Sequence, residues 1–225
     1  MNWSGGKDSA LSLYQLQQNR DYEVAALLTT INKPLDRITM HGVRSSLLEQ
    51  QAKSLGLELY KVELPELPDM DTYGRLMNEK INELKSRHIT HGAFGDIYLE
   101  DLKTYREAQL KKVDMQPVFP IWQWSTKEII RQFIDLGFRA VVVCVNAKFL
   151  DKSFVGRELD ASFIADLPDG VDICGENGEF HSFVYDGPNF QFPIAFERGE
   201  IVHKSYEKEG EEQNYDTGFY FCDLL

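Results

Sequence analysis

The sequence predicts an α/β protein in which a Rossmann-like parallel sheet with helices on both faces precedes a smaller α+β domain. Three observations support this fold class. Up to about residue 147, short apolar runs alternate with stretches of helical periodicity, as in strand–helix–strand units. A loop with two adjacent glycines opens the first helix. Later segments rich in glycine, proline and aromatic residues indicate antiparallel strands, so we expect domains over residues 1–147 and 148–225.

The elements of the first domain follow from two patterns: apolar residues at helical spacing, and short apolar runs typical of buried strands. Residues 116–120 are expected to be extended, and a helix capped by Ser125 or Thr126 reaches Leu136. The clearest buried strand is Ala-Val-Val-Val-Cys-Val, over residues 140–145. The other predicted elements, in chain order, are a helix over 8–19, a strand over 23–31, a helix over 43–56, a strand over 57–62, a helix over 72–87, a strand over 90–97 and a helix over 101–112.

The second domain is predicted from weaker patterns. A short helix is expected around residues 157–165, and alternating stretches at 192–197, 200–206 and 217–223 indicate short antiparallel strands. The acidic run from Glu207 to Glu212 is interpreted as the solvated tip of a hairpin.

The composition bounds the function. A chain of 225 residues with 43% apolar residues is long enough for a substantial core. The formal net charge of −12 argues against a nucleic-acid partner, which would need a basic face. No stretch is apolar enough to span a bilayer and no leader is apparent, so we expect a cytoplasmic protein with no membrane partner. The three cysteines form no C-x-x-C pair and are expected to be reduced.

The strongest chemical signal is Ser4-Gly5-Gly6-Lys7-Asp8-Ser9, called the glycine loop below. Its glycines let the backbone turn sharply and approach a ligand closely. Because the loop opens a helix, unpaired N–H groups and the positive end of the helix dipole are available to an anion. Lys7 adds a positive charge for phosphate, and Ser4 and Ser9 add hydroxyl donors. Asp8 either holds a metal ion or caps the helix.

A second polar segment, over residues 174–182, reads Cys-Gly-Glu-Asn-Gly-Glu-Phe-His-Ser. Its two carboxylates, Glu176 and Glu179, and His181 could converge on one site. The alternative is a glycine-rich bulged hairpin with exposed acids, in which His181 is hydrogen-bonded scaffold.

Together these motifs resemble the diphthine–ammonia ligase family, a branch of the PP-loop N-type ATP pyrophosphatases. The glycine loop differs from the Walker loop, which needs G-x-x-x-x-G-K-[ST]. The family usually has Thr where Ser182 stands. The resemblance covers nearly the whole chain and rests on the glycine loop, Met40-His41-Gly42, Gly95-Asp96-Ile97 with Arg106, Pro120-Ile121-Trp122, Phe154-Val155-Gly156-Arg157, Leu159-Asp160, residues 175–183 and Asp186-Gly187-Pro188.

The resemblance implies an adenine nucleotide alpha hydrolase-like fold and an ATP-dependent ligase that forms AMP and pyrophosphate. A carboxylate attacks the α-phosphate of ATP, pyrophosphate leaves, and ammonia displaces AMP to give an amide. The implied cofactors are ATP and Mg²⁺. In the family the carboxylate belongs to a modified histidine of translation elongation factor 2, so such a protein is an expected partner. Free ammonia is the expected nitrogen source, and the oligomeric state is open, with a homodimer among the options.

Within this reading, the glycine loop holds the pyrophosphate, Lys7 neutralises charge on the leaving group, and Asp8 reaches Mg²⁺ directly or through water. Ligands of such sheets bind at the carboxyl ends of the strands. The adenine is therefore expected beside Leu28, Thr29 and Thr30, with Gly95 and Asp96 on the far wall. Asp96 is equally compatible with a plain turn at a strand end.

Glu176, Glu179 and His181 are the candidates for the acceptor and ammonia side, because a carboxylate can take a proton from ammonium. Arg106 and Arg157 could grip an anionic acceptor, although arginines on helix surfaces are more often solvated.

Two alternatives stay open. One is a PP-loop ATP pyrophosphatase that acts on another acceptor, a small molecule or tRNA. The other is an adenine-nucleotide sensor that binds without turnover.

The strand expected before the glycine loop has only residues 1–3 available, so either it is very short or the numbered chain begins downstream of the natural start.

Overall fold

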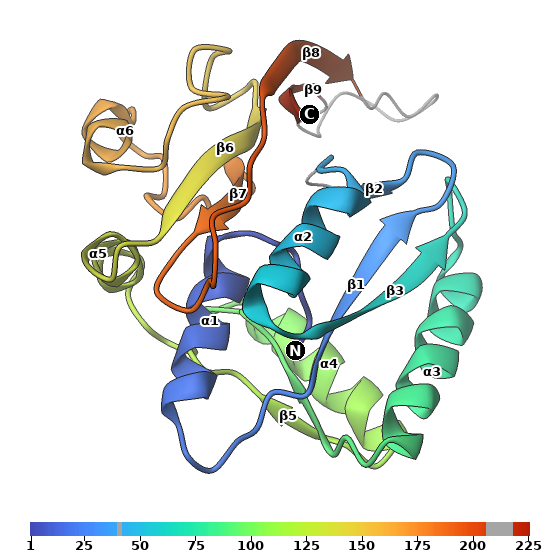
Figure 1. The fold of residues 1–225 in the computed structure, drawn as a ribbon. Helices are drawn as coiled ribbons and strands as arrows, with labels where there is room; N and C mark the ends of the chain where they lie inside the picture. Colours follow the sequence, from blue (N-terminus) through green and yellow to red (C-terminus); the bar gives the residue numbers. More distant parts are fainter. Residues whose placement is uncertain (40–41, 206–217) are drawn as a thin grey trace.

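Figure 1 shows a mixed α/β structure; this computed structural model describes residues 1–39, 42–205 and 218–225. Met40, His41 and the acidic run from Glu207 to Glu212 lie outside the described residues. The helices are α1 (Lys7–Gln18), α2 (Ser45–Leu55), α3 (Met70–Ser86), α4 (Glu100–Lys112), α5 (Thr126–Asp135) and α6 (Ala161–Asp166). The strands are β1 (Ala26–Asn32), β2 (Arg37–Ile38), β3 (Glu58–Leu64), β4 (His91–Ala93), β5 (Gln116–Val118), β6 (Arg139–Asn146), β7 (Phe180–Asp186), β8 (Arg198–Ser205) and β9 (Gly218–Leu224).

The predicted helices are confirmed, with ends that follow their capping residues. α2 ends at Gly56, which adopts the left-handed conformation at φ 68°. α5 begins after Ser125, whose side chain accepts a hydrogen bond from the Glu128 N–H. The short helix α6 is capped in the same way by Asp160.

Two small parallel pairings form the first part of the chain. β1 pairs with β3 over its whole length, and the short β2 lies antiparallel on the other edge of β1. β4 pairs in parallel with β5. Residues 1–3 connect these sheets, because the Leu28 N–H donates to the Met1 carbonyl at 2.8 Å and the Asn2 N–H donates to the Ala93 carbonyl at 2.8 Å. Residues 1–3 thus precede the glycine loop between the two sheets and form an isolated parallel bridge between Asn2 and Leu28.

The C-terminal sheet is antiparallel, in the order β7-β6-β9-β8. The expectation that residues 140–145 join the parallel sheet is wrong, since β6 pairs antiparallel with β7 and with β9. β6 is a central strand buried on both faces, and such a strand is continuously apolar in either kind of sheet. The strand expected over 192–197 is also absent from the described structure. Pro193 cannot donate to a ladder, which explains the irregular backbone there.

The main hydrophobic core runs from the first part of the chain into the C-terminal sheet. It includes Leu11 of α1, Leu27 of β1 and Leu48 of α2 together with Val143 of β6 and Phe183 of β7. The two parts therefore pack as neighbours over one apolar interior. The division at residue 147 stays a prediction.

Within the described ranges, no helix combines the length and the apolar content that crossing a bilayer requires.

Candidate active site

The glycine loop leads directly into α1. Gly6 is the N-cap of the helix and Lys7 is its first residue. The Ser9 hydroxyl donates to the Gly6 carbonyl at 2.9 Å and lies 3.2 Å from the Ser4 hydroxyl. Both serines thus fold the loop over the start of the helix, where N–H groups of the first turn have no partner within the helix.

The C-terminal sheet supports this loop from the other side. The Val184 N–H donates to the Gly5 carbonyl at 2.8 Å, and the Lys7 N–H donates to the Ser182 hydroxyl at 3.2 Å. On the opposite flank, a Cβ on Gly95 would lie 3.0 Å from the Asp8 backbone. Only glycine allows the chain after β4 to approach the loop so closely.

Lys7 carries a buried positive charge between two carboxylates. Its Nζ lies 2.8 Å from Asp8 Oδ2 and 3.7 Å from Glu176 Oε1. Burial alone would lower the pKa of Lys7, but Asp8, the Cys174 thiol and Glu176 outweigh it, so the pKa lies above its ordinary value. The ammonium therefore stays charged at physiological pH.

Glu176 and His181 are titratable groups with opposite behaviour. Burial, followed by the negative charge of Asp8, raises the pKa of Glu176 to about 7, although Lys7 opposes this shift. A carboxyl with a pKa near 7 can accept or donate a proton at physiological pH. Burial and then the charge of Lys7 lower the pKa of His181 to about 4, so its imidazole is neutral at physiological pH.

Glu179 lies near these groups in sequence but has a different environment. Its buried carboxylate accepts hydrogen bonds from the Asp172 N–H at 3.0 Å, the Asn177 N–H at 2.8 Å and the Asn177 side-chain amide at 3.0 Å. These bonds close the backbone of residues 172–179 around the carboxylate. Glu179 is not part of the cavity wall described next.

A cavity of about 630 Å³, called the loop cavity below, lies between the glycine loop, the chain after β4 and the polar segment. It brings together most of the sequence-predicted site residues: Ser4, Gly6, Lys7, Asp8, Ser9, Gly95, Asp96, Glu176 and His181. Gly5 is absent from its wall, because its carbonyl is turned towards β7.

The residues expected beside adenine are divided. Leu28 and Thr30 line a second cavity, of about 610 Å³, that also contacts α3 and α4. Thr29 alternates to the other face of β1 and is buried. Asn2 and Arg106 line both cavities, so the two adjoin there.

The two arginines of the resemblance differ in position. Arg106 Nε lies 2.5 Å from Asp96 Oδ2, and its guanidinium lies over the Phe94 ring at 4.4 Å. It lines the loop cavity. Arg157 instead pairs with Asp166 at 2.7 Å and does not reach the wall of this cavity.

Asp8 has the features of a magnesium ligand. Its Oδ1 is buried and has no hydrogen-bond partner among the described residues. Among all the residues that the structure describes, no group of three or more His, Cys, Asp or Glu side chains is arranged to hold a metal ion. A single carboxylate with a free oxygen suits Mg²⁺, which completes its shell with water and phosphate oxygens.

Three residues of the site region were missed as contributors by sequence reasoning. Asn146 at the end of β6 lines the loop cavity, Ser182 holds the Lys7 N–H, and Gln51 of α2 contacts the glycine loop. Gln51 left a signal, since it is the longest polar side chain among the buried positions of its helix. The contacts of Asn146 and Ser182 depend on long-range packing and left none.

Comparison with known proteins identifies two matching family models. The model described as diphthamide synthase N-terminal domain matches residues 1–117, and the model described as diphthamide synthase C-terminal domain matches residues 125–217. The chain is 26% identical over 220 residues to a diphthine–ammonia ligase of Homo sapiens, covering 88% of this chain and 82% of that protein. It is 24% identical over 224 residues to the Bos taurus protein of the same name, covering 90% and 84%.

Proposed function

The chain belongs to the diphthamide synthase family, and from this premise we propose that it is an ATP-dependent amide ligase that forms AMP and pyrophosphate. The proposed acceptor is a diphthine carboxylate on a translation elongation factor, in line with the name of the relatives. The proposed nitrogen donor is free ammonia, and the proposed location is the cytoplasm.

One observation carries this proposal. The ammonium of Lys7 lies at the start of a helix, 3.7 Å from a carboxyl whose pKa is raised to about 7. A fixed positive charge suits a departing pyrophosphate, and a carboxyl that titrates near neutrality suits proton transfer from ammonium. Both groups line one cavity, which is large enough for a nucleotide tail and a side-chain carboxylate.

At the nucleotide end, the N–H groups of the glycine loop and the hydroxyls of Ser4 and Ser9 bind the β- and γ-phosphates. Lys7 stabilises the charge that develops on the leaving pyrophosphate. Mg²⁺, when bound, would be held by Asp8 and would withdraw charge from the phosphates. The adenine lies towards Leu28 and Thr30, with Gly95 and Asp96 beside the phosphates. Thr29 is buried on the other face of β1 and does not contact the adenine.

At the acceptor end, a carboxylate oxygen bonds to the α-phosphorus and the bond to pyrophosphate breaks. Ammonium loses one proton to Glu176, and the resulting ammonia attacks the acyl carbon of the acyl-adenylate. The nitrogen then loses a second proton to solvent as AMP leaves, which gives the amide. Glu179 positions Glu176 by holding the backbone of residues 172–179. Neutral His181 acts as a hydrogen-bonding group, and Arg106 orients the anionic acceptor through its position beside Asp96.

We also propose that the two small parallel sheets form one Rossmann-like sheet. Residues 1–3 would be its central strand, between β1 and β4, and the glycine loop would then leave the carboxyl end of that strand. This order matches the rule that ligands bind at the carboxyl ends of parallel strands. The hydrogen bonds from Asn2 to Ala93 and from Leu28 to Met1 support it.

The proposal is tested with ATP labelled at the α-phosphate, Mg²⁺ and ammonium, with and without an elongation factor that carries diphthine. We expect labelled AMP and pyrophosphate only when the acceptor is present. Release of ADP and phosphate would contradict cleavage at the α-phosphate. AMP formation with a small carboxylic acid or tRNA, but not with the elongation factor, would assign another acceptor, and binding without turnover would indicate a sensor.

A further inference from the structure

Gln51 is a polar side chain in the middle of the protein core. It lies on α2, far along the chain from the glycine loop, and is fully buried. Its amide forms three hydrogen bonds. It accepts from Trp3 Nε1 at 2.9 Å and donates to the carbonyls of Gly5 at 3.1 Å and Val184 at 2.5 Å. Buried amides need such partners, but these three all lie beside or across from the glycine loop.

The bond to Gly5 determines which way the loop peptide faces. The Gly5 carbonyl accepts from the Gln51 amide and from the Val184 N–H, so it points towards α2 and β7. In a planar trans peptide, the carbonyl and the following N–H point in opposite directions. The Gly6 N–H therefore faces away from α2 and donates to the Ser4 hydroxyl at 3.3 Å, and Gly6 lines the loop cavity whereas Gly5 does not.

Gly5 and Gln51 also fit each other sterically. Gly5 has a φ of +76°, and a Cβ at this position would lie 2.8 Å from Gln51 Oε1. The space that a side chain would occupy is filled by the Gln51 amide. The first glycine of the loop is thus required by its conformation and by this neighbour.

From these contacts we infer that Gln51 is a positioning residue for phosphate binding, an inference that rests on the proposed function. It turns the Gly5 carbonyl out of the loop cavity and keeps the Gly6 N–H on the cavity side, where this N–H holds the Ser4 hydroxyl that is proposed to bind the phosphates. A carbonyl oxygen facing the cavity would repel a phosphate, whereas an N–H attracts it. Gln51 itself touches neither nucleotide nor acceptor.

The test compares Gln51→Met with Ser54→Ala in the full chain. Ser54 lies on the same helix, is equally buried and bonds to the backbone of Phe192 instead of the loop. Calorimetric titration with pyrophosphate and Mg²⁺ measures affinity, and thermal unfolding measures stability. We expect Gln51→Met to weaken pyrophosphate binding about tenfold and Ser54→Ala by less than about twofold, since about one hydrogen bond to the bound pyrophosphate would be lost.

The inference would be overturned if both variants bound pyrophosphate as tightly as the wild type, or if both lost affinity to the same extent. If Gln51→Met loses its circular dichroism signal, Trp3→Phe decides, because it removes the bond to Gln51 Oε1 and leaves the Gln51 side chain in place. Weaker pyrophosphate binding by Trp3→Phe would then support the inference, and wild-type affinity would contradict it. A wild-type chain that binds neither pyrophosphate nor ATP would instead contradict the proposed function.

Discussion

Two charged side chains, Lys7 and Glu176, define the chemistry proposed for the loop cavity. They lie 3.7 Å apart, and each alters the titration of the other. The carboxylates keep Lys7 protonated in spite of its burial. Burial and the charge of Asp8 raise the pKa of Glu176 to about 7, close to neutral pH. One group is therefore a fixed charge and the other is a proton carrier. Substitutions at the two positions should therefore have different effects.

Replacing Lys7 by Met should strongly reduce the rate of AMP formation. The methionine fills similar volume but leaves the departing pyrophosphate without its positive partner, so we expect kcat to fall by about 10²–10³-fold. Lys53→Met, at an exposed position of α2, is the matched control and should retain wild-type turnover. Retained AMP formation in a folded Lys7→Met chain would remove the glycine loop from the mechanism.

Replacing Glu176 by Gln should change the pH dependence of turnover. The wild-type rate should rise with pH through about 7, where Glu176 loses its proton, measured at constant ammonium concentration. Gln cannot accept a proton, so kcat should fall by about 10²–10⁴-fold and the inflection should disappear. An unchanged pH profile would exclude Glu176 as the proton acceptor.

The same substitution has an opposite effect on stability. Unfolded Glu has a pKa of about 4.3. Because folding raises the pKa of Glu176 to about 7, the folded protein binds the proton more tightly, and stability is lost as the pH rises between these values. Glu176→Gln should therefore unfold at a higher temperature than the wild type at pH 8, and at a similar temperature at pH 4.

At the scale of elements, the segment before β7 is organised around one carboxylate. Glu179 accepts three hydrogen bonds from Asp172 and Asn177, which fixes the backbone that carries Glu176. β7 continues from this segment and contacts the glycine loop through Ser182 and Val184. One strand and the segment before it thus connect both ends of the proposed site.

Glu179→Gln should loosen this segment. The substitution replaces an acceptor oxygen with an amide that faces N–H donors, so we expect a loss of about 1–3 kcal/mol and a Tm lower by about 2–10 °C. Hydrogen exchange of residues 172–177 should accelerate. Asp169→Asn, at an exposed site nearby, is the control and should change neither quantity. Unchanged exchange in Glu179→Gln would mean that the carboxylate does not hold the segment.

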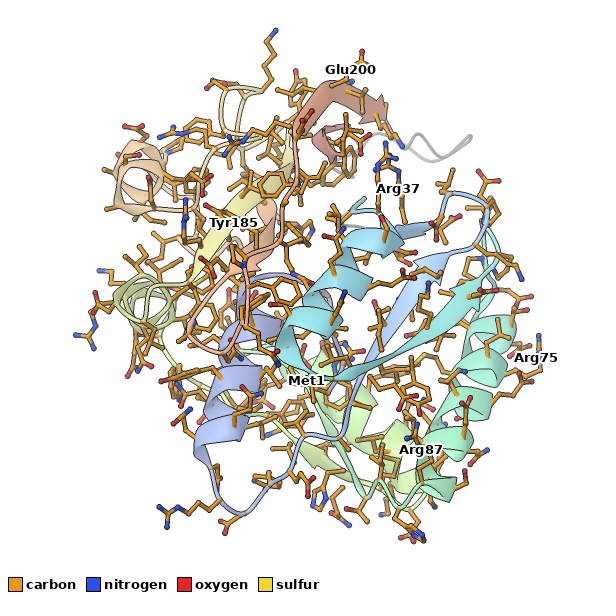
Figure 2. The ribbon with its side chains drawn as sticks, in the orientation of Figure 1. Met1, Arg37, Arg75, Arg87, Tyr185 and Glu200 are labelled. Carbon is orange, nitrogen blue, oxygen red and sulfur yellow. The ribbon has the colours of Figure 1, made fainter. Side chains whose placement is uncertain are left out.

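At the scale of the whole molecule, an ionic cluster joins the last strand, β9, to β2 and the start of α2. Asp223 of β9 lies 2.8 Å from Arg37 of β2 and 2.6 Å from Arg44, which directly precedes α2. Arg37, labelled in Figure 2, also donates to the Gly42 carbonyl at 2.6 Å. Hydrogen bonds from Arg44, and then from Arg37, hold the pKa of Asp223 well below its usual range.

Asp223→Asn should weaken the attachment of the C-terminal sheet. The carboxylate is partly exposed, so we expect a loss of only about 1 kcal/mol at pH 7, or about 2–4 °C in Tm. Because the folded pKa is depressed, this contribution is present above about pH 4 and is lost as the pH falls further. The Tm difference between variant and wild type should therefore shrink in acid. Glu63→Gln, which removes an exposed ion pair with Lys33, should leave Tm unchanged.

The predictions from sequence succeeded where the signal is local. The helical spacing after Lys7 and the capping residues Gly56 and Ser125 placed α1, α2 and α5 correctly, because these patterns depend on neighbouring residues alone. Family membership is confirmed. Local patterns failed for residues 140–145, since a strand buried on both faces has the same composition in parallel and antiparallel sheets.

By itself, the sequence determined the glycine loop, its position at a helix start and the residue types available for phosphate chemistry. Only the tertiary structure decided which of them meet. In the folded chain, Glu176 forms an ion pair with Lys7, and Glu179 accepts hydrogen bonds from the backbone of its own segment. The Gln51 amide donates to the Gly5 carbonyl. The physical reason is that backbone conformation depends on adjacent residues, whereas burial, charge neighbours and hydrogen-bond partners come from segments far apart in the chain.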